Sequence, residues 1–180
     1  MRILKEQTAG LIIDIQEKLY PYIYKNESVV TGTTILIQGL KILDIPLVIT
    51  QQYTKGLGET IPSITGAVGN YIPVEKIAFS CCDEPDFMKR LSQLGRKNII
   101  IAGIEAHVCV LQTIIDLLDN AYVPVVVENC ISSRNNRDKE IAVERMRQEG
   151  AIITTCESIL FELTRFAGTD VFKQISKIIK

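Results

Sequence analysis

The sequence alternates short, continuously apolar runs with longer segments whose apolar residues recur at helical spacing. The runs are rich in valine and isoleucine, which is typical of strands buried on both faces of a sheet. Five such strands are predicted, at residues 10–15, 46–50, 98–103, 124–129 and 151–155. Because strands alternate with helices, the expected fold is α/β, with a mostly parallel sheet covered by helices on both faces.

The helical segments complete this pattern. They are predicted at residues 27–43, 84–94, 105–121, 136–149, 157–166 and 170–179. Gly95 and Gly150 directly follow two of them, where a left-handed cap is expected. Residues 51–73 carry four glycines, two prolines and no clear period, which indicates a long, functional loop. Because there is no repeat or linker, we expect residues 1–180 to form one domain.

Composition excludes several classes of protein. The net charge of −1 gives no general attraction to nucleic acid or to a membrane surface. The amino terminus lacks an apolar signal segment, so a cytoplasmic location is expected. The five cysteines form no C-x-x-C pair and there is one histidine, which argues against a disulfide framework or a structural zinc site. We therefore expect no metal and no cofactor.

Three residues stand out as candidates for chemistry. Asp14 ends the first predicted strand, Lys76 lies beyond the long loop, and Cys109 lies where the strand at 98–103 gives way to a helix. Each also has a plain structural interpretation. Asp14 could cap a helix or a strand end, Lys76 could be a surface lysine, and Cys109 could pack as a small hydrophobic residue.

Taken together, the three residues form a coherent catalytic device. A thiol becomes a good nucleophile when a carboxylate takes its proton and a cation stabilises the thiolate. Asp14 and Cys109 both follow strands, so one cleft at the carboxyl edge of the sheet could hold both. The only histidine, His107, lies two residues before Cys109 and should point away from it.

The chain resembles the isochorismatase-like cysteine hydrolases, and within them the isochorismatase-domain-containing (MAR1-type) group. The resemblance is carried by LIIDIQEKL, TQQYTKGLGETIPSI, EKIAFSCC, GIEAHVCVLQT, ENCISSRNNRDKEIAVERMRQEGAIITTCESILFEL and FKQISKIIK. It implies a three-layer αβα sandwich and a catalytic triad of Asp14, Lys76 and Cys109. It also implies a cis peptide at Ile104–Glu105, with the backbone N–H groups of Glu105 and Cys109 forming an oxyanion hole.

The resemblance also narrows the expected activity. Isochorismatase proper has no nucleophilic cysteine, so Cys109 argues against that reaction. Metal-dependent nicotinamidases hold their metal with an aspartate and two histidines, whereas TQQYTKG offers neither a histidine nor an acid. The expected function is a cofactor-independent cysteine hydrolase that forms a thioester acyl-enzyme with a small amide-like or related acyl substrate, with C–N bonds as the expected target.

Further residues and two other functions remain open at this level. Gln16, Tyr53 and Phe79 are candidates for substrate binding, although Gln16 could fix the strand end and the aromatic rings could belong to the core. One alternative function is a non-catalytic interaction or scaffold protein that keeps the pocket. Another is a thiol-redox sensor with Cys81 or Cys82 as the resolving thiol, although these two adjacent cysteines are expected to be unpaired.

Surface patterns suggest how the chain assembles. The mixed charges of residues 134–147 predict a solvated helix surface or subunit contacts. The segment at 170–179 has one apolar side with lysines between the apolar positions, which predicts an exposed ridge that another chain covers. Relatives suggested by the resemblance are commonly homo-oligomers, so a homodimer or higher homo-oligomer is expected, with a small molecule as the other partner.

Overall fold

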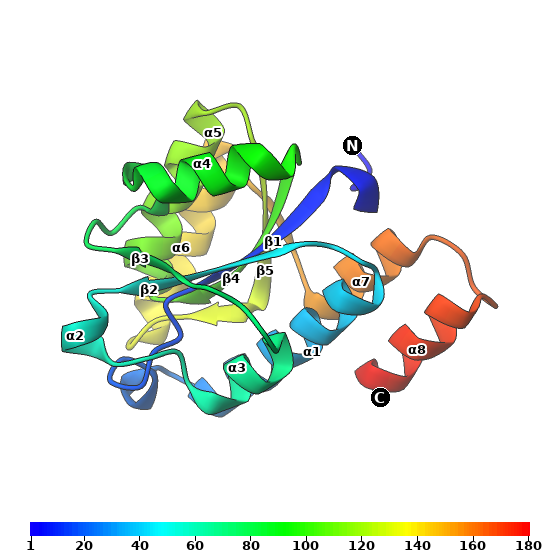
Figure 1. Cartoon of the computed structure of the whole chain (residues 1–180), viewed down its shortest axis with the longest axis horizontal. Helices are drawn as coiled ribbons and strands as arrows, with labels where there is room; N and C mark the ends of the chain where they lie inside the picture. The colour runs from blue at the N-terminus through cyan, green and yellow to red at the C-terminus, as the bar shows by residue number, and fades with distance from the viewer.

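A computed structural model describes all 180 residues, and at its centre lies a six-stranded, entirely parallel sheet (Figure 1). The strand order across the sheet is β3-β2-β1-β4-β5-β6. The strands are β1 (Thr8–Ile13), β2 (Leu47–Gln52), β3 (Val74–Lys76), β4 (Asn98–Ile104), β5 (Val123–Ser132) and β6 (Ile152–Thr154). The order reverses between β1 and β4, which opens a crevice at the carboxyl ends of these strands.

Helices cover both faces of the sheet (Figure 1). One face carries α1 (Asn26–Ile42), α3 (Pro62–Val68), α7 (Cys156–Thr164) and α8 (Asp170–Ile179). The other carries α4 (Pro85–Leu94), α5 (Leu111–Asp119) and α6 (Asn136–Glu149), while α2 (Thr54–Leu57) is a single turn after β2. The predicted three-layer αβα sandwich is therefore confirmed.

The central strands contain continuous apolar runs because successive side chains enter different cores. Ile12 of β1 packs with α1 and α7, whereas its neighbours Leu11 and Ile13 pack with α4 and α5. This is the reason for the continuous apolar runs in the sequence. Gly95 and Gly150 end α4 and α6 with φ of 61° and 111°, as the cap interpretation predicted.

The structure corrects several predicted boundaries. Residues 51–73 are not one loop, because β2 continues to Gln52 and both α2 and α3 follow. The strand β3 was missed because it has only three residues, Val74–Lys76, with a single apolar one. The helix predicted at 105–121 is interrupted, because a π turn at Ala106–Val110 precedes α5.

The terminal helix α8 packs on its own chain. Its Ile175 is fully buried and belongs to the core that contains α1 and α7, and the rings of Phe172 and Phe161 lie 6.0 Å apart. The expectation that this apolar stripe forms a ridge for another chain is therefore wrong in its main part. None of the helices is both long and apolar enough to span a membrane.

Gly103 of β4 leaves no room for a side chain beside Ile13 of β1, and we predict that Gly103→Ala destabilises the fold strongly. A Cβ at this position would lie 2.3 Å from the backbone oxygen of Ile13, and the φ of 141° disfavours any side chain. We expect the free energy of unfolding to fall by more than about 3 kcal/mol in urea denaturation. The matched control is Gly66→Ala on the open side of α3, which should gain about 0.5–1 kcal/mol. Equal effects of the two substitutions would contradict the prediction.

Candidate active site

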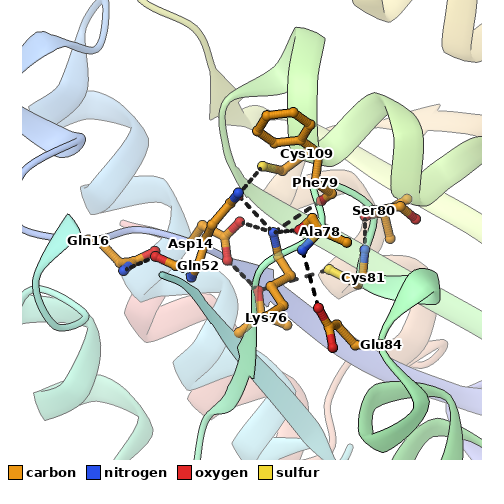
Figure 2. A network of polar contacts seen from close by, with 12 residues as sticks. Asp14, Gln16, Gln52, Lys76, Ala78, Phe79, Ser80, Cys81, Glu84 and Cys109 are labelled. Atoms are coloured by element: carbon orange, nitrogen blue, oxygen red, sulfur yellow. Dashed lines mark hydrogen bonds and ion pairs between the residues drawn. The ribbon is translucent and has the colours of Figure 1, made fainter. Parts of the chain in front are cut away.

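Four neighbouring strands deliver one polar side chain each to the carboxyl edge of the sheet (Figure 2). Lys76 ends β3, Gln52 ends β2, Asp14 directly follows β1, and Cys109 lies in the π turn after β4. Because these strands are adjacent in the order β3-β2-β1-β4, the four residues meet where the strand order reverses. The structure thus brings together the three residues that were predicted as the triad.

Asp14 and Lys76 form a buried ion pair. Lys76 Nζ lies 2.6 Å from Asp14 Oδ2, and both side chains are 0% exposed. Asp14 Oδ1 accepts a hydrogen bond of 2.7 Å from Thr50 Oγ1, while Oδ2 has no partner besides the ammonium. Burial raises the pKa of Asp14, and the charge of Lys76 opposes this rise. Asp14 therefore has a carboxylate oxygen available to take a proton.

Lys76 is held in its charged form. Besides Asp14, its ammonium donates to Gln52 Oε1 at 3.1 Å and to the carbonyls of Ala78 and Phe79 at 3.2 and 3.0 Å. Burial is the largest single influence and lowers the pKa of Lys76, but the contributions of Asp14, Cys109 and Cys81 together outweigh it, so the pKa is raised. The ammonium of Lys76 offsets the desolvation cost of the buried Asp14 carboxylate.

The side-chain amide of Gln52 fixes the proton on Cys109. Its Oε1 faces the ammonium of Lys76 and its Nε2 donates to the carbonyl of Ile77 at 3.1 Å, so both partners require the same orientation of the amide. Cys109 Sγ lies 3.0 Å from that oxygen and must donate to it. Burial, with the charge of Asp14, raises the pKa of Cys109 to about 12. The resting residue is therefore a thiol. Lys76 does lower the pKa of this thiol, as expected, but burial and the charge of Asp14 raise it by more.

This resting state predicts an unusual pH profile for Cys109. Below its pKa the thiolate fraction rises about tenfold per pH unit, so alkylation by iodoacetamide should keep rising from pH 7 to pH 10 without a plateau. Peptide-resolved mass spectrometry after short exposures measures the rate. In the unfolded protein the same thiol should level off above about pH 8.5. A plateau near neutral pH in the folded protein would contradict the assignment.

The backbone around Glu105 has the form expected of an oxyanion site. The Ile104–Glu105 peptide is cis, as the resemblance implied. The carbonyl of Glu105 accepts from the N–H groups of Val108 and Val110 at 3.1 and 3.3 Å, which fixes the π turn. The N–H of Glu105, on a residue only 5% exposed, has no partner in the chain. Unpaired buried N–H groups are rare, so this donor is a candidate for binding a substrate oxygen.

The three candidate substrate-binding residues lie in different environments. Gln16 is fully buried, and its side chain binds the N–H and carbonyl of Gln52 and the carbonyl of Gly58, which favours the alternative that it fixes the strand end. Tyr53 and Phe79 are about half exposed and flank the site in the chain, next to Gln52 and three residues after Lys76. Their contact with a substrate stays a prediction.

Sequence reasoning missed two members of this network, Thr50 and Gln52. Both are polar side chains near the end of β2, beside the strand that leads to Asp14. Gln52 was overlooked because β2 was expected to end at residue 50, and Thr50, inside the predicted strand, was counted only as a strand residue. His107 is hydrogen-bonded to Ser133 through Nδ1 at 2.9 Å. No three His, Cys, Asp or Glu side chains are grouped so that they could hold a metal ion.

Comparisons with known proteins identify the family of this fold. The pattern of the isochorismatase domain matches residues 8–158. Isochorismatase family protein 1B of Dictyostelium discoideum is 41% identical over 99% of this chain and 89% of its own length. The chain therefore belongs to the isochorismatase family, and its fold is that of isochorismatase-like hydrolases.

Solved structures show the same relationship. The structure of MAR1 ribonuclease from Caenorhabditis elegans superposes with a TM-score of 0.93 at 37% identity, covering 99% of this chain and 92% of that one. The ycaC gene product of Escherichia coli, described as an octameric hydrolase of unknown specificity, superposes with a TM-score of 0.93 at 22% identity, covering 99% and 89%. At that lower identity the likeness concerns the fold alone.

Proposed function

We propose that the chain is a cofactor-independent cysteine hydrolase of small amide-like or related acyl substrates, with Asp14, Lys76 and Cys109 as its catalytic triad. The observation that carries the proposal is the buried Asp14–Lys76 pair beside the Cys109 thiol. Asp14 and Cys109 lie close enough that each shifts the pKa of the other. At 5% exposed, Cys109 is the triad residue that a substrate can reach, since Asp14 and Lys76 are 0% and 1% exposed.

The first half-reaction transfers the acyl group to sulfur. The Cys109 thiol passes its proton to Asp14 as sulfur bonds to the substrate carbonyl carbon, and the N–H groups of Glu105 and Cys109 hold the resulting oxyanion. When the tetrahedral intermediate collapses, the C–N bond breaks and Asp14 returns the proton to the departing amine. The product is a thioester on Cys109, and Lys76 stays charged throughout.

The second half-reaction releases the acid. A water molecule gives a proton to Asp14 as its oxygen attacks the thioester carbonyl, and the same N–H groups hold the oxyanion again. The C–S bond then breaks, and Asp14 returns the proton to sulfur. Net, one amide and one water become one carboxylic acid and one amine, and the resting thiol is restored. The pKa of about 12 for Cys109 fits this scheme, because the thiol is the state that begins and ends each cycle.

The direct test is to trap the acyl-enzyme. Small amides, carbamoyl compounds and esters are assayed with wild type and Cys109→Ala, and intact-protein mass spectrometry looks for an acyl mass on Cys109 within the first turnover. We expect at least one compound to be hydrolysed by wild type alone and to leave that adduct. Turnover that persists in Cys109→Ala would overturn the proposal.

The C. elegans protein is named a ribonuclease, so RNA cleavage is a second activity to consider. RNA cleavage needs a positively charged surface for the phosphates and a general acid and base beside the ribose. This chain has a net charge of −1, and its single histidine is bonded to Ser133 rather than directed to the triad. These features favour acyl transfer over RNA cleavage.

We also propose that the protein works as a homo-oligomer in the cytoplasm. Tyr53, Ile77 and Phe79 are more than half exposed around the site, which is a costly surface to leave in water. The octameric E. coli relative shows that the fold can assemble through its own surface. All five cysteines are free, as a reducing compartment would keep them. Light scattering should give a mass of at least twice 20.1 kDa, and a mass of one chain would contradict the assembly.

A further inference from the structure

The side chain of Glu105 is clamped by Arg134. Glu105 is 6% exposed at its side chain, and Arg134 Nη2 donates to its Oε1 at 3.0 Å. Arg134 Nε and the backbone N–H of Arg134 donate to Oε2 at 3.1 and 3.3 Å. Two parallel bonds from one guanidinium are the strongest and most directional form of this interaction. Both carboxylate oxygens of Glu105 are therefore held in place.

Arg134 differs in this respect from the charges that surround it in the sequence. The sequence grouped it with a mixed-charge helix surface, but it lies in the loop between β5 and α6, with 66% of its side chain exposed. Arg137, three residues along, does behave in that way, because it pairs with Glu140 at the surface of α6 with 71% of its side chain exposed. Arg134 instead turns back to the buried carboxylate beside the π turn.

The remaining polar groups of Glu105 show what the clamp fixes. Its carbonyl is held by the N–H groups of Val108 and Val110. Its carboxylate is held by Arg134. Only its N–H is left without a partner. A residue fixed at both its side chain and its carbonyl has little freedom to rotate. The contacts to the carboxylate and to the carbonyl therefore set the direction of the free N–H.

We propose that Arg134 is a positioning residue that orients the oxyanion-binding N–H of Glu105 through the Glu105 carboxylate. The inference rests on the proposed acyl-transfer function and adds to it a residue outside the triad. Arg134 does not touch the reacting atoms. Its contribution is realised only when negative charge develops on a substrate carbonyl oxygen, because that is when the N–H of Glu105 gains its partner.

Two reagents of similar size separate this role from a general effect on Cys109. Addition of the Cys109 thiol to acrylamide forms a C–S bond and moves an electron pair onto the amide oxygen, before the thiol proton is delivered to carbon. Displacement of iodide from iodoacetamide also forms a C–S bond, but the negative charge leaves with iodide. An oxyanion donor therefore accelerates the addition to acrylamide more than the displacement of iodide from iodoacetamide.

The test measures both rates at Cys109 by peptide mass spectrometry at one pH, normalised to N-acetylcysteine. In wild type we expect the acrylamide-to-iodoacetamide ratio to exceed that of the free thiol.

Arg134→Met should lower this ratio about tenfold, because the oxyanion donor would be misdirected, while the iodoacetamide rate should stay unchanged. Arg134→Lys, which keeps the charge but not the paired bonds, should fall in between, and Arg137→Met is the matched control. Glu105→Gln should lower the ratio, and adding Arg134→Met to it should lower it little further, because both remove the same contact.

The outcomes distinguish the two proposals. An Arg134→Met protein that remains folded and keeps the wild-type ratio, or that loses both rates equally, would overturn the positioning role while the acyl-transfer function stands. A wild-type ratio no greater than that of N-acetylcysteine would overturn the oxyanion site itself, and this inference with it.

Discussion

Asp14→Asn is expected to make Cys109 react faster with iodoacetamide while turnover is lost. Apart from burial, the negative charge of Asp14 is the main cause that raises the pKa of the thiol, and the ammonium of Lys76 acts in the opposite direction. Removing the carboxylate leaves Lys76 with its three other oxygen partners, from Gln52, Ala78 and Phe79. The thiol pKa should therefore fall, and each unit of that fall increases the thiolate fraction about tenfold at neutral pH.

Hydrolysis should change in the other direction. Asparagine cannot accept the thiol proton or return it to the leaving amine, so turnover of a substrate found in the amide panel should fall about 1000-fold. Alkylation and turnover are measured on the same preparation. Asp44→Asn is the matched control, because Asp44 is exposed and shares the left-handed backbone of Asp14, with φ of 57° against 51°. Slower alkylation in Asp14→Asn would contradict the claim that the charge of Asp14 raises the pKa of the Cys109 thiol.

Lys76→Met is expected to destabilise the fold at neutral pH. It removes the only cation from a carboxylate that is 0% exposed, and breaking a buried pair in this way costs about 3–5 kcal/mol of unfolding free energy. The double variant Asp14→Asn, Lys76→Met should recover part of that loss, because it no longer buries an unpaired charge. Urea denaturation of the four proteins in this cycle gives the coupling directly.

The loss in Lys76→Met should depend on pH. Burial raises the pKa of Asp14, and without Lys76 nothing cationic opposes that rise. A folded pKa above the unfolded value stabilises the protein below the unfolded pKa of about 3.9, and this contribution is lost as pH rises through the folded pKa. The deficit should therefore be smaller at pH 5 than at pH 7.5. Lys139→Met, which breaks the more exposed pair with Glu128, should cost at most about 1 kcal/mol, and an equal loss in both variants would contradict the argument.

The sequence predicted those parts of the fold that depend on local pattern. Continuous apolar runs identified the central strands, and the glycine caps at Gly95 and Gly150 identified the helix ends. Asp14 and Cys109 were predicted to meet because parallel strands end at one edge of a sheet. Lys76 could be placed beside them through the family resemblance, since the three-residue strand that carries it has too little pattern to be recognised.

The parts that could not be predicted depend on contacts between distant segments. Gln52 bridges Lys76 and Cys109 only because β2 extends two residues beyond the apolar run that marks it. Arg134 reaches Glu105 because the loop after β5 folds back over the π turn, and an arginine at a loop end gives no local sign of that direction. The raised pKa of Cys109 likewise follows from burial, which composition alone does not determine.

The short strand β3 has a consequence for how the protein opens. It is an edge strand of three residues, so few hydrogen bonds hold it, and only Val74 in the core and Lys76 at Asp14 anchor it to the interior. Edge elements of this kind detach first in native-state fluctuations. The N–H of Tyr53, which is bonded to the carbonyl of Lys76, would then exchange with solvent deuterium ahead of the amides of β1 and β4. Each such excursion would withdraw the ammonium and leave Asp14 without its partner, so the proposed catalytic centre would stay intact only while this short edge strand is in place.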